Sequence, residues 1–348
     1  MANQYLSHGE IHKQYISLGQ TLGYVLDNKS RIVDFFSRGS NSGDIVFVAC
    51  GSSYWMSLSA HKTMKLKTGR RSYAVKASEV VLCPEEFRGA YDDPVFICPS
   101  RSGRTQELLD AVEILKSMYP GSRVLSIVEY ADNKLASNSD LSLNIGWANE
   151  DSVCQTRSFS NLYTACATMA ALIGDDRVFI ENLREYLQNA PSLYLKHEAP
   201  ICEIADAAKI KSIVALGSGL QYGIAVEGAY IVIEMSQFDA NYFQLLEYRH
   251  GPIVTATPGT AVFICSGMHS GHERKIAGEI RAAGAKVYAV ATSDVDWADH
   301  AFSLDGDYEK EIIALHFIFV MQSFAYHFAV SHGRNPDNPG NLVPYIVY

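Results

Sequence analysis

The chain has 348 residues, a length that fits two domains of ordinary size, and its 29 Lys and Arg residues against 38 Asp and Glu give a formal net charge of −9. Hydrophobic residues make up 48% and charged residues 19%, which is enough apolar material for folded cores and excludes a disordered chain. The negative charge repels phosphate backbones and so excludes a broad nucleic-acid surface, but backbone amides could still bind one small anion.

No secretory signal and no membrane span are expected. The N-terminus lacks a basic region followed by an apolar run, and the most apolar stretch, 312–330, is interrupted by polar residues, which favours a buried helix. The seven cysteines are odd in number and form no C-x-x-C pair, so we expect reduced structural thiols in a cytoplasmic protein. Cys50 and Cys154 lie near the motifs described below, which leaves a catalytic thiol as an alternative.

The pattern of apolar residues predicts helices first and then two α/β units. Spaced apolar residues over 5–37 predict amphipathic helices. Short apolar runs then alternate with helix-length segments, which predicts parallel strands at 45–50, 72–76, 95–98 and 124–128, an apolar helix at 159–172 and a charged connecting helix at 175–200. Ser212–Leu220 resembles Val46–Tyr54 and restarts the pattern, with further strands at 261–265 and 286–291 and a long helix around 315–330. The sequence therefore predicts a tandem α/β protein.

One loop has the composition of a phosphate site. After the predicted strand at 95–98 come Ser100, Ser102, a glycine and Thr105, directly before a helix. Amide hydrogens, hydroxyl donors and the positive end of the helix dipole could together bind a phosphate at this edge of the sheet. An ordinary Ser- or Thr-capped helix fits the loop alone equally well. The corresponding loop of the second half, Ser266–His272, lacks this hydroxyl spacing, so we expect one phosphate site rather than two.

A carboxylate and an imidazole in the second half could move protons. Glu234 interrupts the apolar run 231–235, where a carboxylate is costly unless it is paired or functional, and His250 precedes a Gly-Pro turn. Such a pair suits proton transfer between adjacent carbons of a sugar and the opening of its ring. Taken alone, the residues fit a salt-bridged Glu and a His in a turn better.

At these residues the sequence resembles the tandem SIS (sugar isomerase) family, and above all the isomerase half of glucosamine-6-phosphate synthase. Five segments resemble family motifs in the same order: Cys50–Tyr54 (C-G-T-S-Y), Ser100–Thr105 (S-Q-S-G-E-T), Gln155–Phe159 (S-T-K-A-F), Glu227–Pro252 (E-G-A, the catalytic Glu and E-x-x-H-G-P) and Asp337–Leu342 (D-x-P-x-N-L). The resemblance extends from about Ile45 to the C-terminus.

The resemblance implies two SIS domains, each a mainly parallel sheet with helices on both faces in a flavodoxin-like three-layer sandwich. We expect a helical segment at 1–37, a first domain with the phosphate loop at 38–195, and a second at 196–348 with the catalytic pair and the tail. Glu234 would carry the carbon-bound proton and His250 would assist ring opening. A homodimer with shared active sites is implied, and no metal or organic cofactor is expected. The residues implied to bind phosphate or substrate are Ser52, Ser53, Ser100, Arg101, Ser102, Thr105, Val153, Gln155 and Glu247.

The departures from the family pattern are informative. Met1 is followed by Ala2 rather than a nucleophilic cysteine, and we expect no glutaminase domain. Ile231 and Pro344 stand where the isomerase has two lysines, one of which forms a Schiff base. A substrate that carries its own amine needs no such lysine, which resembles the fructosamine-6-phosphate deglycase branch. Arg101 could pair with a carboxylate of the amino-acid part, although a second phosphate contact or a solvated side chain is the simpler interpretation.

The function expected is therefore a deglycase or deaminase that acts on a 6-phosphorylated amino sugar or fructosamine and releases a sugar 6-phosphate and an amine. An aldose–ketose phosphosugar isomerase is the first alternative, and a non-catalytic phosphosugar sensor is the second. The partner expected is a sugar 6-phosphate or its amine adduct, with neither nucleic acid nor membrane. The sequence does not identify the sugar, the attached amine, or whether His250 acts within its own subunit.

Overall fold

The computed structural model describes residues 5–37, 43–206, 208–267 and 271–347, which form two compact units. The N-sheet unit contains residues 16–150, 157–184 and 343–348, and the C-sheet unit contains residues 1–15, 151–156 and 185–342. Each unit thus takes short segments from outside the simple boundaries that the sequence predicts at 38 and 195. Those boundaries stay predictions.

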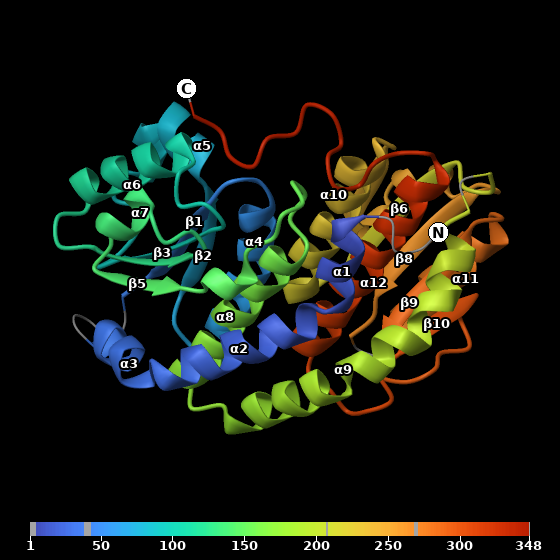
Figure 1. The fold of residues 1–348 in the computed structure, drawn as a ribbon, viewed down its shortest axis with the longest axis horizontal. Coiled ribbons are helices and arrows are strands. Elements are labelled where there is room, and N and C mark those ends of the chain that lie inside the picture. The colour runs from blue at the N-terminus through green and yellow to red at the C-terminus, as the bar shows by residue number, and fades with distance from the viewer. Residues whose placement is uncertain (1–4, 38–42, 207, 268–270, 348) are drawn as a thin grey trace. The chain divides into compact units, whose positions relative to one another are not determined.

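The N-sheet unit is built on a five-stranded parallel sheet in the order β2-β1-β3-β4-β5 (Figure 1). Alternate side chains of β1, β3 and β4 pack on α5 and α6, while α4 and α8 cover the other face. The bounds are α2 (Gln14–Asp27), α3 (Lys29–Ser37), β1 (Ile45–Ala49), α4 (Gly51–Thr68), β2 (Ser72–Lys76), α5 (Ala77–Leu82), η1 (Pro84–Phe87), β3 (Val95–Ser100), α6 (Gln106–Met118), β4 (Arg123–Val128), α7 (Lys134–Ser137), β5 (Leu141–Asn144), η2 (Gly146–Ala148) and α8 (Arg157–Ile173).

The C-sheet unit has a second parallel sheet in the order β10-β9-β8-β6-β7. Helix α11 packs on one face, and α10 and α12 pack on the other and against each other. The bounds are α1 (Leu6–His12), α9 (Arg177–Ile204), β6 (Ser212–Gly217), η3 (Gly219–Gln221), α10 (Tyr222–Ser236), β7 (Ala240–Gln244), η4 (Glu247–Arg249), η5 (Pro252–Thr255), β8 (Thr260–Cys265), α11 (Gly271–Ala282), β9 (Lys286–Ala291), β10 (His300–Ser303) and α12 (Lys310–Ser331).

The two sheets repeat one topology. Numbered along the chain within its own unit, each sheet has the strand order 2-1-3-4-5, which is the flavodoxin-like order. The predicted fold class and the internal repeat are confirmed. The pattern of apolar residues did not predict β5, β7 or β10, and each of these strands lies at an edge of its sheet.

Helix α12 is the central helix of the C-sheet unit. Among the residues that the structure describes, it alone is long and apolar enough to cross a membrane, with a mean hydropathy of 1.6, yet that stretch is 100% buried in the protein. It lies close to α10 because Gly228 has no side chain: a Cβ there would stand 2.8 Å from Cγ of Met321. A helix that is buried on all sides is a core helix. The polar residues that interrupt this apolar stretch predict such a helix.

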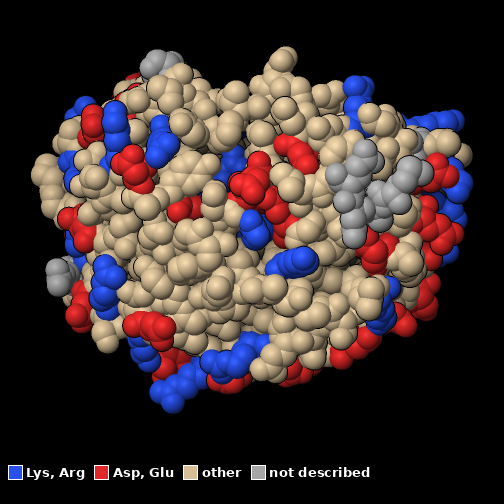
Figure 2. Space-filling view, viewed as in Figure 1, with Lys and Arg blue, Asp and Glu red and all other residues tan. Residues whose placement is uncertain are grey.

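Charges of both signs are mixed over the face of the protein drawn in Figure 2. Figure 2 shows Lys and Arg side chains interspersed with Asp and Glu over the face drawn. A nucleic-acid surface would instead gather basic side chains on one face or along one helix. The distribution on this face agrees with the net charge of −9.

Candidate functional site

The predicted phosphate loop, residues 100–105, lies at the switch point of the N-sheet unit. The sheet order changes direction between β1 and β3, and ligands of open α/β sheets bind at such a point beyond the carboxyl ends of the strands. Ser52 and Ser53 begin α4 directly after β1, and Ser100 ends β3. Because β1 and β3 are parallel neighbours, their ends lie at the same edge. The structure therefore brings the two groups of predicted hydroxyls to one edge.

The loop conformation leaves the serine hydroxyls able to donate. The Oγ of Ser100 accepts the amide hydrogen of Gly103 at 3.1 Å, and the Oγ of Ser102 accepts that of Arg104, also at 3.1 Å. A hydroxyl that accepts a hydrogen bond still has its own hydrogen to donate to an anion. Gly103 has φ 59°, and a Cβ there would stand 2.4 Å from Oδ1 of Asn133, so this position requires glycine.

Helix α6 begins without a side-chain cap. Thr105 is its N-cap residue, but the Thr105 side chain makes no capping hydrogen bond. The alternative of an ordinary Ser- or Thr-capped helix therefore does not describe this loop. The first-turn amide of Gln106 donates to the carbonyl of Ile346 at 3.1 Å, so the C-terminal tail lies on this helix terminus. Tyr348, the last residue of the tail, lies outside the described residues.

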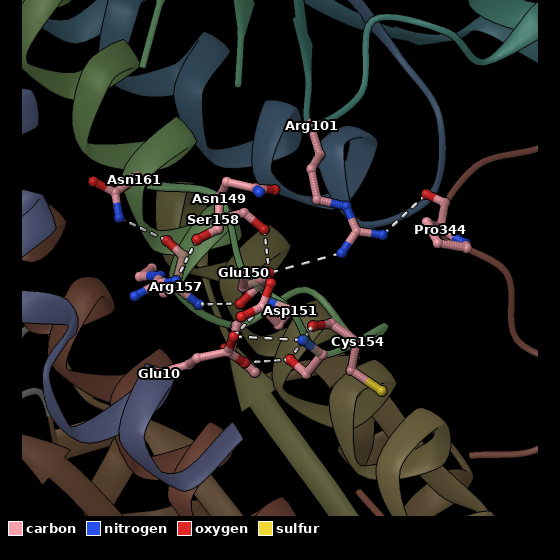
Figure 3. A network of polar contacts seen from close by, with 12 residues as sticks. Glu10, Arg101, Asn149, Glu150, Asp151, Cys154, Arg157, Ser158, Asn161 and Pro344 are labelled. Atoms are coloured by element: carbon pink, nitrogen blue, oxygen red, sulfur yellow. Dashed lines mark hydrogen bonds and ion pairs between the residues drawn. The ribbon is translucent and has the colours of Figure 1, made fainter. Parts of the chain in front are cut away.

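Arg101 faces the protein interior (Figure 3). The residue is 5% exposed, and its guanidinium lies 3.8 Å from the Glu150 carboxylate and donates to the carbonyl of Pro344 at 2.9 Å. Glu150 also accepts the amide hydrogen of Arg157 at 3.0 Å and the hydroxyl hydrogen of Ser158, so it caps α8. The alternative of a solvated Arg101 side chain is wrong. A contact between Arg101 and substrate stays a prediction.

The sequence interpretation missed Glu129, which lies beside Arg101. The residue is 3% exposed, its amide donates to the Arg101 carbonyl at 3.1 Å, and neither carboxylate oxygen has a hydrogen-bond partner among the described residues. Burial raises the pKa of the Glu129 carboxyl well above its ordinary value, and the charge of Glu150 adds to this, while Arg101 and Arg157 oppose it. The sequence signal for a functional role of Glu129 is its position directly after the apolar run 124–128.

In the C-sheet unit, Glu234 and His250 occupy different surroundings. Glu234 is half-buried in the last turn of α10, where its neighbour Met235 is fully buried. His250 and Glu247 are exposed, in and after the turn η4. Buried Tyr248 supports this turn, because its hydroxyl lies 3.1 Å from Oγ1 of Thr255. The arrangement leaves the imidazole accessible to a ligand.

The predicted substrate contacts Val153 and Gln155 belong to the segment 151–156. Glu10 accepts the amide hydrogen of Asp151 at 2.6 Å, and Figure 3 shows its carboxylate pointing at this segment. The amide of Val153 donates to the carbonyl of Asp337 at 3.1 Å. That amide could therefore reach a phosphate only after this bond breaks.

Each unit thus gathers its own group of predicted site residues. Ser52, Ser53, Ser100, Arg101, Ser102 and Thr105 belong to the N-sheet unit, whereas Val153, Gln155, Glu234, Glu247 and His250 belong to the C-sheet unit. The predicted roles of these residues toward a substrate stay predictions.

The equivalent switch point of the C-sheet unit already holds a carboxylate. Glu273, in the first turn of α11, accepts the Ser266 hydroxyl hydrogen at 2.7 Å and the Gly267 amide hydrogen at 3.3 Å. A carboxylate at these donors takes the position that an anion would occupy. Residues 268–270 of this loop lie outside the described residues.

Cys50 and Cys154, the two cysteines near the predicted motifs, lack the surroundings of a nucleophile. All seven cysteines are free, and Cys154 is fully buried. Burial raises the pKa of the Cys50 thiol to about 12, with the nearby Glu107 charge adding to the effect. A reactive cysteine needs a lowered pKa, so the catalytic-thiol alternative finds no support at Cys50.

The fold and these loops define a class of protein, and comparison with known families identifies it. Residues 40–173 and 207–332 both match the SIS domain. The chain therefore belongs to the SIS domain family, and it contains two such domains.

The sequence of this chain is similar to those of phosphosugar enzymes. It is 29% identical over 336 residues to the glutamine–fructose-6-phosphate aminotransferase (isomerizing) of Sulfolobus acidocaldarius, covering 96% of this chain and 55% of that protein. For the same-named protein of Methanothermobacter thermautotrophicus the identity is 28%, covering 86% of this chain and 50% of that protein. The chain spans about half the length of these curated relatives and is homologous to their isomerase half.

Solved structures share the fold over nearly the whole chain. The tagatose-6-phosphate ketose/aldose isomerase of Escherichia coli has a TM-score of 0.87 at 22% identity, covering 98% of this chain and 97% of that one. The glucosamine-6-phosphate deaminase of Thermotoga maritima has a TM-score of 0.78 at 26% identity, covering 94% of this chain and 99% of that one.

Proposed function

We propose that this chain is a phosphosugar deglycase or deaminase that releases an amine from a 6-phosphorylated substrate. The broader class, an SIS-family enzyme of the phosphosugar isomerase type, follows from the relatives. The observation that carries the finer proposal is that one chain contains a hydroxyl-rich switch-point loop, a half-buried carboxylate and an exposed imidazole, and lacks the two expected lysines.

Two structural details support the amine-bearing substrate. Ile231, which replaces the first lysine, is 0% exposed in α10, so an apolar side chain fills this place. Pro344, which replaces the second, offers its carbonyl to Arg101. Neither position supplies a primary amine, so in this proposal no imine to the protein forms, and the amine on C1 of the substrate becomes the nitrogen of the aldimine that is hydrolysed.

The reaction then needs only proton transfers and water. The phosphate loop binds the 6-phosphate, and His250 assists opening of the sugar ring. Glu234 removes a proton from C1 of the fructosamine to give an enaminol and returns it to C2, which leaves an aldimine at C1. Water adds to C1, the C–N bond breaks, and the products are glucose 6-phosphate and the free amine.

Simple aldose–ketose isomerisation is the second candidate. The fold similarity to the E. coli tagatose-6-phosphate ketose/aldose isomerase, whose TM-score is 0.87, favours it. The similarity to the T. maritima glucosamine-6-phosphate deaminase favours release of an amine instead. The two reactions use the same proton transfer and differ in whether a C–N bond breaks.

Turnover of a defined substrate panel tests the proposal. Amino-acid adducts of fructose 6-phosphate, glucosamine 6-phosphate and tagatose 6-phosphate are supplied in turn, and the sugar phosphate and the amine are both quantified. We expect amine release, and a loss of about 10²–10⁴-fold in kcat for Glu234→Gln with unchanged substrate affinity. The exposed Glu203 provides a control, since Glu203→Gln should keep full activity. Full activity of Glu234→Gln would disprove the mechanism, and binding without any turnover would indicate a sensor.

We also propose a homodimer in which His250 serves the partner's site. Glu234→Gln and His250→Ala chains, inactive alone, are mixed after mild dissociation and allowed to reassociate. Recovery of part of the activity is expected, because some dimers then have one site with both intact groups. Absence of recovery in a proven mixed dimer would place both groups in one chain.

A further inference from the structure

Three histidines of the C-sheet unit converge on one carboxylate, and none of these four residues is a predicted site residue. The Nε2 atoms of His327 and His8 lie 2.8 Å and 3.2 Å from Oε1 of Glu198, and the Nε2 atom of His12 lies 2.7 Å from the other carboxylate oxygen, Oε2. One donor atom from each of the four residues can be chosen so that all lie within 4.8 Å of one another. We call these four residues the His₃Glu cluster.

Three helices bring the cluster together. His8 and His12 are one turn apart on α1, so both rings project from the same side of that helix, and their centroids are 4.3 Å apart. Glu198 comes from α9 and His327 from α12. Two histidines at positions i and i+4 of a helix form a common half of a zinc site, and a third nitrogen and a carboxylate complete four ligands.

The geometry is close to that of a tetrahedral site. With metal–nitrogen and metal–oxygen distances near 2.0–2.2 Å, neighbouring ligand atoms of a tetrahedron lie about 3.3 Å apart. The distances from Oε1 of Glu198 to the His327 and His8 nitrogens, 2.8 Å and 3.2 Å, are close to this spacing, whereas the His12 nitrogen lies 2.7 Å from Oε2, so coordination of one ion requires small shifts of these side chains.

Burial and charge fit a small divalent cation. The side chains of His8, His12 and Glu198 are 16–23% exposed and that of His327 is 7% exposed, so the cluster is shielded but can be reached from solvent. The carboxylate offsets one unit of a 2+ charge, and the imidazoles contribute neutral nitrogen ligands. A donor set of three nitrogens and one oxygen is typical of Zn²⁺ rather than of Mg²⁺ or Ca²⁺.

We propose that the His₃Glu cluster binds one zinc-class divalent metal ion per chain and fixes α1 to α9 and α12. Helix α1 has seven residues, which is too short to be stable alone, so a shared ion would add to the contacts that hold it. The site departs from the expectation that the protein contains no metal. It is independent of the proposed sugar chemistry, because its ligands include none of the predicted site residues.

The test measures metal binding directly on the full chain without an affinity tag. The protein is stripped with a chelator at pH 7.5 and titrated with ZnCl₂ by calorimetry and by thermal denaturation. One equivalent should bind, and Tm should rise by about 5 °C at 100-fold excess over Kd. Titration with Co²⁺ should give the intense visible absorption of tetrahedral coordination, which reports the ligand geometry whatever the stability.

Variants assign the ion to the cluster. His8→Gln and His327→Gln should each remove the bound equivalent and the Co²⁺ absorption. His272→Gln and Cys202→Ser should keep both, because these exposed residues lie outside the cluster. Lack of stoichiometric binding by the stripped protein, or binding unchanged in the two cluster variants, would overturn the proposal. If a variant does not fold, the Co²⁺ spectrum of the unaltered chain decides: tetrahedral bands support the site and their absence refutes it.

Discussion

At the scale of single residues, the oxygen and the hydrogen of the Ser102 hydroxyl have different partners in our proposal. Its oxygen holds the Arg104 amide and its hydrogen is free for a phosphate oxygen. A hydrogen bond to a charged group contributes about 1.5–3 kcal/mol, so Ser102→Ala should raise KM by roughly 10–150-fold. Steady-state kinetics checks this, and Ser117→Ala, an exposed serine of α6, is the control. An unchanged KM would mean that Ser102 does not touch the phosphate.

Glu129 allows a prediction about charge rather than contact. Its raised pKa means that the folded protein holds the proton after the unfolded chain has lost it, so this stabilising contribution is complete below pH 4.5 and is lost as the pH rises through the folded pKa. Glu129→Gln keeps the neutral shape at every pH. It should therefore raise Tm at pH 7–8 relative to the unaltered protein, with a smaller difference near pH 4.5.

Thermal denaturation across this pH range measures the effect of Glu129→Gln. The matched comparison is Glu203→Gln, since Glu203 is exposed. A Glu129→Gln variant that is less stable at pH 8 would show that the carboxylate is ionised in the folded protein and held by Arg101 and Arg157.

At the scale of elements, the contact between α10 and α12 depends on one glycine. A Cβ at Gly228 would lie 2.8 Å from Met321 and 3.1 Å from Phe317, in a fully buried position. Gly228→Ala should therefore destabilise the protein by about 1–3 kcal/mol, as overpacked cores do. At Gly278 of α11 a Cβ meets nothing within 4 Å, so Gly278→Ala should stabilise by about 0.5–1 kcal/mol.

Urea denaturation of the two glycine variants measures both effects with one method. Opposite signs are expected, because both residues are helical and only their neighbours differ. Equal effects would show that backbone propensity, and not the packing of α10 on α12, determines the outcome.

The strands also show which parts of the fold the sequence predicts and which it does not. Central strands such as Ile45–Ala49 were predicted because a parallel strand buried on both faces is an uninterrupted apolar run. The edge strand Leu141–Asn144 is short and half-buried, and its mixed composition does not distinguish it from a loop. Local signals therefore predicted the sheet centres and the hydroxyl loop.

Long-range pairs were beyond those local signals. Arg101 was interpreted as a ligand or a solvated side chain because nothing near it in the chain indicates Glu150 as its partner. The His₃Glu cluster joins the first helix to the last one, and only the i, i+4 pair of His8 and His12 is visible locally. Such pairs depend on how helices meet, which composition and periodicity do not specify.

At the scale of the whole molecule, buried neutral histidines determine the response to acid. Burial lowers the pKa of His197 to about 4, with Lys196 adding to the effect, and it lowers that of His316 well below 6.5. His197 Nδ1 lies 2.9 Å from His316 Nε2, so one ring donates its N–H hydrogen to the bare nitrogen of the other while both rings are neutral. At these two histidines the unfolded chain takes up protons below pH 6.5, whereas the folded chain does so only at lower pH.

Stability should therefore be complete above pH 6.5 and fall as the pH drops toward 4, by up to about 1.4 kcal/mol per pH unit for each histidine. Thermal denaturation between pH 8 and 4.5 measures the slope. His316→Gln should start from a lower Tm but show a shallower slope, whereas His272→Gln should leave the slope unchanged. A slope for His316→Gln equal to that of the unaltered chain would show that His316 is not held neutral in the fold.

The carboxylate of Glu273 makes the two copies of the switch point unequal. Duplication of one fold gives two equivalent places for an anion, and in the second copy a side chain provides a negative charge that cannot diffuse away. In our proposal, phosphate therefore binds at one place per chain instead of two. Glu273→Ser would exchange that tethered charge for a hydroxyl and make the second copy resemble the first, which offers a direct route to an engineered chain with two anion sites.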